Sequence, residues 1–74
     1  MESYQDIKVK FGIHLRTLRT EKDLSLRQLA VKAEMNHTKI GEIEAGKTDL
    51  KLTSIFKLAS GLGIEPKFLL DFIE

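Results

Sequence analysis

The sequence predicts an all-α fold, a compact five-helix bundle that forms a single domain over residues 1–74. Three observations support this prediction. Apolar residues recur at intervals of three and four, which is the period of one helix face. Capping residues precede several of these segments, and glycine or proline marks where they end or begin. Strand signals are absent.

The first helix is predicted from a stripe of apolar residues at helical spacing, namely Tyr4, Ile7, Phe11, Leu15 and Leu18. These residues fall on one side of a helix, the side expected to face the core. The helix is expected to end near Lys22 and Asp23.

Two short helices joined by a tight turn are predicted between about residues 25 and 45. Ser25 and Gln28 form a capping box at the start of the first of them. Asn36 is a good N-cap for the second, and Gly46 follows it in the left-handed C-terminal position. This layout is a helix-turn-helix, whose second helix is built to enter the major groove of DNA.

The fourth helix is predicted from Leu52, Ile55, Phe56, Leu58, Ala59 and Leu62, and the glycines around Leu62 stop it. Glu65 and Pro66 begin a fifth helix, expected over about residues 66–73, because proline suits the first helical turn.

Apolar side chains wrap most of the circumference of the fifth helix, more than the inner face of one small domain needs. We therefore expect a homodimer. The expected interface residues are Phe68, Leu69, Phe72 and Ile73, with Leu70 on the same helix and Val9 and Ile13 of the first helix adding to them.

Composition excludes several classes of function. The chain has no cysteine, so it has no disulfide framework and no thiolate metal site. No apolar run approaches the roughly 18 residues of a membrane span, and a cytoplasmic location is expected. Two isolated histidines, without converging partner groups or a phosphate-binding glycine loop, indicate no enzyme, no metal site and no cofactor.

The net charge is only +1, but its distribution is uneven. Residues 8–57 hold eleven Lys or Arg against six Asp or Glu, whereas both ends of the chain are acidic. The basic character therefore coincides with the predicted helix-turn-helix, as expected of a nucleic-acid-binding unit.

Three segments in this order and spacing, FGIHLRTLRTEKDLSLRQLA, NHTKIGEIEAGK and LTSIFKLASGLGIEPKFLL, resemble the Cro/C1-type (XRE-like) helix-turn-helix family over residues 11–70. The resemblance implies a lambda-repressor-like DNA-binding domain. It also implies a sequence-specific transcription regulator, active as a homodimer on an inverted-repeat operator in double-stranded DNA and autoregulatory in some members.

The chain length and the ending GIEPKFLL are similar to controller proteins of restriction–modification systems, although phage repressors and antitoxins share the frame. RNA polymerase is a further candidate partner. The alternative function is an antitoxin-like protein-interaction module with secondary DNA binding.

The resemblance implies that the third helix reads base edges. Helical geometry places four residues opposite the apolar side of that helix, namely His37, Thr38, Gly41 and Glu42. Thr38 can contact a base edge or a thymine methyl, His37 a guanine or a phosphate, and Glu42 a cytosine amine. Gly41 allows close backbone approach. Alternatively, Glu42 pairs with Lys39.

Phosphate contacts are expected to position this helix without reading sequence. The candidates are Arg27, Asn36, Lys39, Lys47, Thr48 and Lys51. Three such phosphates per subunit predict a slope of about −5 for log K against log salt in a dimer.

In the family, residues matching Arg19 and Glu44 form a partly buried ion pair between the first and third helices, and the same structural role is expected here. The chain also departs from the family pattern. Leu26 stands where glutamine is common, and Ala45 stands where a polar or basic residue is common. Glu34 and Asp23 replace glycines, and a left-handed conformation at Glu34 costs about 1 kcal/mol.

Overall fold

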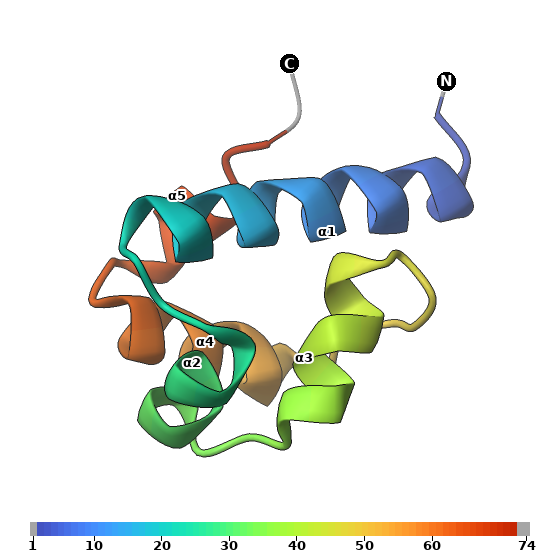
Figure 1. Ribbon diagram of the computed structural model, residues 1–74. Coiled ribbons are helices and arrows are strands. Elements are labelled where there is room, and N and C mark those ends of the chain that lie inside the picture. The colour runs from blue at the N-terminus through green and yellow to red at the C-terminus, as the bar shows by residue number, and fades with distance from the viewer. Residues whose placement is uncertain (1, 73–74) are drawn as a thin grey trace.

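The computed structural model describes residues 2–72, which form five helices and no strand (Figure 1). The all-α prediction is thus confirmed. The helices are α1 (Tyr4–Glu21), α2 (Leu26–Ala33), α3 (His37–Glu44), α4 (Leu52–Leu62) and α5 (Pro66–Leu69). The long helix α1 lies along one side of the bundle (Figure 1). Within the described residues, no helix combines the length and apolarity needed to cross a membrane.

Capping boxes open two of the helices. At α2, the Gln28 amide N–H donates to the Ser25 hydroxyl at 3.1 Å, and the Ser25 amide donates to the Gln28 side chain at 2.8 Å. Ser3 and Asp6 make the same reciprocal arrangement at α1. Four backbone N–H groups at a helix start lack helical partners, so each box satisfies two donors and fixes where its helix begins.

Left-handed residues mark the ends of the first four helices. Asp23 follows α1 with φ 57°, Glu34 ends α2 with φ 55°, and Gly46 and Gly63 follow α3 and α4 with φ 73° and 72°. The left-handed position expected at Gly46 is therefore confirmed, and Asp23 and Glu34 adopt the same conformation where glycine is usual in the family. Two of the four carry side chains, which tolerate this conformation less well than glycine does.

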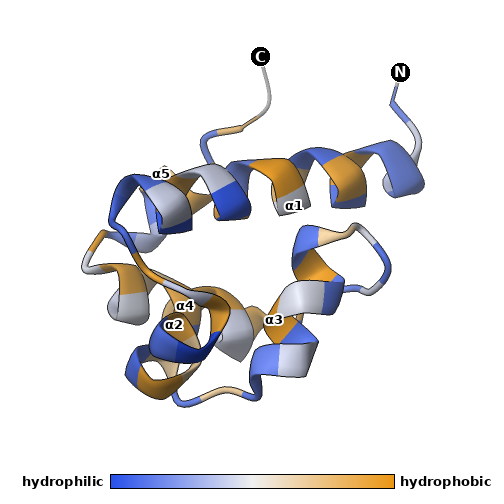
Figure 2. Ribbon diagram, viewed as in Figure 1, coloured by the Kyte–Doolittle hydropathy of each residue, from blue (hydrophilic) through white to orange (hydrophobic). Residues whose placement is uncertain are grey.

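The core draws on all five helices. Its fully buried side chains are Leu15, Leu29, Ile40, Ile43, Leu58 and Leu69. Hydrophobic segments of α2, α3 and α4 meet inside the bundle, while hydrophilic residues dominate the outer turns (Figure 2). Burial of these apolar groups is the main favourable term in the stability of the domain.

Three apolar residues expected on helix stripes remain exposed. Tyr4 is 86% exposed, in the first turn of α1, which lies at one end of the bundle (Figure 1). Leu52 and Phe56 are 71% and 55% exposed, one turn apart on the outer side of α4. Helical spacing identified the elements correctly but did not show which apolar positions the other helices cover.

The fifth helix is shorter than predicted, and one expected interface residue is wrong. α5 ends at Leu69, not near residue 73, and Leu69 is fully buried in the core, so it is no surface for a partner. The His14 ring bonds the Phe68 carbonyl at 3.0 Å, and Phe72 packs edge-on against Phe11 at 5.4 Å. These contacts turn the chain back onto α1. The predicted interface residue Ile73 lies outside the described residues.

Candidate DNA interface

One side of the helix α3 packs against the core, and the opposite side is exposed to solvent. Ile40 and Ile43 are 0% and 1% exposed and attach the helix to the core. The opposite side carries the predicted reading residues, with Thr38 and Glu42 exposed and His37 and Gly41 partly exposed. Thr38 and Glu42 stand one turn apart, so both can face the same ligand surface.

Three predicted contacts meet at the start of α3. The side-chain oxygen of Asn36 accepts a hydrogen bond from the Thr38 amide at 2.7 Å, which caps the helix. The amide NH₂ of Asn36 remains available as a donor. Arg27, in the first turn of α2, lines the same surface hollow as Asn36 and His37. The N-terminal end of α3 therefore has hydrogen-bond donors near the positive end of the helix dipole, an arrangement suited to binding phosphate.

The remaining phosphate candidates lie in the loop after α3. Lys47 and Lys51 are exposed, and Thr48 is partly exposed. The ammonium group of Lys39 donates to the Thr48 hydroxyl at 3.1 Å, linking α3 to the loop. The expected alternative, Lys39 paired with Glu42, does not describe the structure, because Lys39 reaches toward the loop instead.

Arg19 and Glu44 form the ion pair that the family resemblance implied. The guanidinium makes two parallel hydrogen bonds to the carboxylate, at 2.7 and 3.0 Å, and a third to the Leu24 carbonyl at 2.8 Å. The two side chains are only 11% and 7% exposed. Hydrogen bonding to Glu44 raises the pKa of Arg19 above its usual value, so the guanidinium stays charged throughout the neutral range.

α1 also contacts the end of α3 through its backbone. A methyl group at Gly12 would lie 2.4 Å from the Glu44 carbonyl oxygen, far inside van der Waals contact. The Gln5 side chain donates to the Gly46 carbonyl at 3.1 Å. Sequence analysis missed both residues. The available signal was a glycine inside a strong helical pattern, which often marks close packing.

Leu26 lies beside α3 at the position where glutamine is common in the family. A methyl group at Gly41 would lie 3.7 Å from the nearest Leu26 methyl, in ordinary contact. Leu26 thus lies close to the middle of α3 and presents only apolar atoms there, whereas glutamine would offer hydrogen bonds. The side chain contributes shape at this junction and no phosphate contact.

Comparisons with known proteins agree with this geometry. A model of the helix-turn-helix domain matches residues 10–67. Control protein C.MunI of Mycoplasma sp is 40% identical over 70 residues, which cover 93% of this chain and 95% of that protein. This chain belongs to the helix-turn-helix family of control proteins. Control protein C.BamHI of Bacillus amyloliquefaciens is 37% identical over 68 residues, covering 90% of this chain and 84% of that relative.

Solved structures show the same relationship. The restriction–modification controller protein C.AhdI from Aeromonas hydrophila superposes with a TM-score of 0.84 at 42% identity, covering 86% of this control protein and 97% of that chain. A transcriptional regulator from Vibrio cholerae gives a TM-score of 0.86 at 25% identity, covering 90% of this control protein but 38% of that chain. This control protein is a transcription regulator of the helix-turn-helix type.

Proposed function

We propose that this control protein binds double-stranded DNA as a homodimer, with α3 of each subunit in the major groove of one half of an inverted repeat. The observation that carries the proposal is the orientation of α3, with one side buried in the core and the other exposed. Its apolar side is fixed by Ile40 and Ile43, while Thr38 and Glu42 face outward. A helix presented in this way can enter a groove without disturbing the core.

The proposed roles follow from position. Thr38 and Glu42 read base edges near the middle of the contact, with His37 beside them and Gly41 admitting the DNA backbone or a base close to the helix. Arg27 and Asn36 bind phosphates at the start of α3, and Lys39, Lys47, Thr48 and Lys51 bind phosphates at the loop that follows it.

The proposed dimer surface is the C-terminal apolar surface, which we define as Ile13, Phe68, Leu70 and Phe72. Ile13, Phe68 and Leu70 are each about half exposed or more, at 60%, 51% and 49%. Ile13 and Phe72 line the same hollow at the surface. Phe72 and Leu70 line a second hollow. Large exposed apolar side chains that lie near one another are characteristic of protein–protein contact.

The exposed pair Leu52 and Phe56 on α4 is the competing dimer surface. Sequence analysis placed both residues on the fourth helix without assigning them a contact. A charged substitution on the true dimer surface should dissociate the dimer, whereas the same change on the other surface should not.

At the operator, the proposed outcome is control of transcription, including that of the regulator itself. The support is membership of a family whose relatives are named control proteins. RNA polymerase is then the second proposed partner, either excluded from the promoter by the bound dimer or contacted by it.

Selection of bound duplexes from a random pool tests the function directly. We expect an inverted repeat whose half-sites lie one helical turn apart, about 34 Å between centres. The Thr38→Ala variant should bind the selected site more weakly while keeping its affinity for random DNA. Thr53→Ala, at an exposed threonine on α4, is the matched control and should bind like wild type.

Failure to enrich any sequence, with DNA binding no stronger than that of an unrelated basic protein, would reject sequence-specific binding. Enrichment of a single half-site without a repeat would retain the reading helix and reject the dimer.

A further inference from the structure

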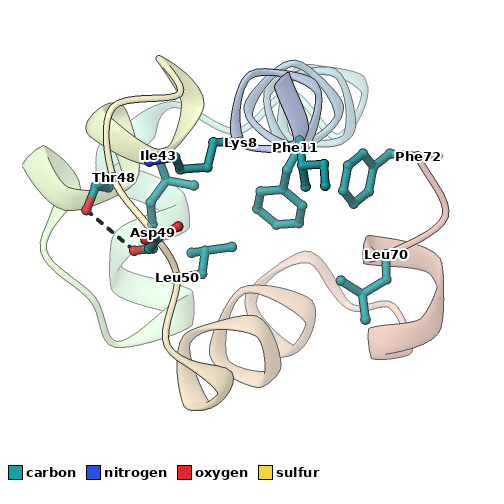
Figure 3. Close-up of a pocket in the computed structure, with 9 residues that line it drawn as sticks. Lys8, Phe11, Ile43, Thr48, Asp49, Leu50, Leu70 and Phe72 are labelled. Carbon is teal, nitrogen blue, oxygen red and sulfur yellow. Dashed lines mark hydrogen bonds between the residues drawn. The ribbon is translucent and has the colours of Figure 1, made fainter. Parts of the chain in front are cut away.

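The loop between α3 and α4 is fixed on three sides. Gly46 closes α3 in the left-handed conformation, and its carbonyl accepts a hydrogen bond from Gln5 at 3.1 Å. On the inner side, Leu50 points beneath the loop toward Phe11 and lines the apolar hollow there (Figure 3). Thr48 also lines this hollow, and its hydroxyl points away from Phe11 (Figure 3). These contacts attach the loop to α1 and to the core.

The side chains of Lys39, on α3, and Thr48, on the loop that follows α3, are in contact. Their side-chain atoms, the ammonium nitrogen and the hydroxyl oxygen, lie 3.1 Å apart, although nine residues separate them in the chain. Among residues 2–72, Lys39 has no carboxylate partner within ion-pair distance, so its charge is not neutralised. An ammonium group has three donors, and this contact uses one.

The Thr48 hydroxyl also retains a donor. It accepts from Lys39 and donates only over 3.4 Å to the Asp49 carbonyl, a length at the weak end for a hydroxyl donor. Its hydrogen can turn to a stronger, anionic acceptor at small cost. The Lys39 ammonium and the Thr48 hydroxyl, 3.1 Å apart, can thus each donate a hydrogen bond to the same ligand, and the ammonium carries a full positive charge.

We propose that Lys39 and Thr48 form a single clamp that binds one and the same phosphate of the DNA backbone. The proposal rests on the DNA-binding function proposed above and specifies it further, since six separate residues were named there as phosphate contacts. Lys39 supplies the charge and Thr48 a second, oriented donor to another oxygen of the same phosphodiester. The existing contact between them pre-organises both groups, so little side-chain freedom is lost on binding.

The nearby carboxylates bear on this assignment. Glu42 and Asp49 are both exposed, on α3 and on the loop respectively. Because these two carboxylates repel phosphate, the charge of Lys39 has to offset them at the clamp, with Lys47 and Lys51 of the same loop adding to the local positive charge. Removal of that charge should therefore cost more than removal of a solvated lysine.

The test is a double-mutant cycle measured as affinity for the selected operator. Lys39→Gln removes the charge at similar length, and Thr48→Val removes the hydroxyl at similar shape. We expect about 10-fold weaker binding for Lys39→Gln, about 4-fold for Thr48→Val, and about 10-fold for the double variant, because coupled groups are not additive. Lys51→Gln with Thr48→Val is the matched control, and those two effects should multiply.

Two further measurements distinguish a phosphate clamp from a contact that is only structural. Lys39→Gln should reduce the steepness of the salt dependence by about 2 for a dimer, whereas Thr48→Val should leave it unchanged. Single phosphates of the operator can also be replaced by neutral methylphosphonates. One position per half-site should abolish the loss of affinity caused by either variant.

Independent effects of the two variants, or their assignment to two different phosphates, would overturn the clamp while leaving DNA binding intact. Failure of the unmodified protein to bind any duplex would instead reject the proposed function itself. Thermal melting of each variant checks that the fold is retained, and a large loss of stability in Thr48→Val would count against a surface role.

Discussion

Arg19 and Glu44 are two charges largely removed from water where α1 meets the end of α3. Each is satisfied by the other, and Arg19 also donates a hydrogen bond to the Leu24 carbonyl. A buried pair of this kind is weak evidence for stability as such, but breaking it leaves an unpaired charge inside the protein.

Arg19→Ala should therefore lower the free energy of unfolding by about 3 kcal/mol, because Glu44 loses its partner. Thermal or urea unfolding measures the change. Arg16→Ala, at an exposed arginine on the same helix, is the control and should change stability by no more than about 0.5 kcal/mol. An Arg19→Ala protein as stable as wild type would show that the pair is dispensable.

Glu34 presents the opposite case, a residue held in a conformation that suits it poorly. Its φ of 55° is forced by the tight turn between α2 and α3. Glu34→Gly should raise the free energy of unfolding by about 1 kcal/mol, because glycine removes the left-handed penalty. The melting temperature of a domain this size should then rise by about 4–8 °C.

A glycine in the regular part of the same helix is the control for this change. Lys32→Gly, two residues earlier and exposed, should destabilise by about 1 kcal/mol, since glycine is a poor helix former. Destabilisation by both substitutions would mean that the Glu34 side chain makes a contribution larger than its backbone strain.

At the scale of elements, the two helical glycines at the junctions of α3 behave differently. Gly12 of α1 lies against the backbone of α3, where no side chain fits, whereas Gly41 of α3 has room for a methyl group. The close approach at Gly12 and the ion pair between Arg19 and Glu44 both fix the position of α3 relative to α1. Gly41 is free of that constraint.

Gly41→Ala should stabilise the protein by up to about 1 kcal/mol, because alanine is the better helix former and its methyl only touches Leu26. The same variant should bind operator DNA less well, because the methyl stands on the face proposed to approach the groove. Melting curves and operator binding measured on one preparation check both halves. Tighter binding would remove Gly41 from the proposed contact.

For the whole molecule, one reading helix covers only a few base pairs, and the proposed dimer doubles both the readout and the phosphate contacts. The small domain leaves apolar surface uncovered at its C-terminal end and on α4. The choice between these surfaces decides the distance between the two α3 helices and so the spacing of the operator.

Phe68→Glu should dissociate the dimer without unfolding the subunit, because Phe68 is 51% exposed. Sedimentation measures the oligomeric state. The slope of log K against log salt should fall from about −5 to about half that value, because one subunit contacts half the phosphates. Phe56→Glu is the comparison on α4. Dissociation by Phe56→Glu alone would move the interface to that helix.

Sequence by itself determined the order of the five helices, the caps at Ser25 and Asn36, the left-handed turns and the outward side of α3, because these depend on neighbours within a few positions along the chain. The family resemblance supplied the Arg19–Glu44 pair. Even a departure such as Glu34 was readable, since the tight turn demands one backbone conformation regardless of side chain.

Only the tertiary structure decided which surfaces stay open. Leu69 and Phe56 both looked like apolar helix residues, yet one is fully buried and the other is half exposed. The same holds for the end of α5 at Leu69, where the chain turns back onto α1. It also holds for the close packing of Gly12 against α3 and for the contact between Lys39 and Thr48, since both join segments distant in the sequence. Such contacts depend on how whole helices pack, and periodicity within one helix carries no record of what its neighbours cover.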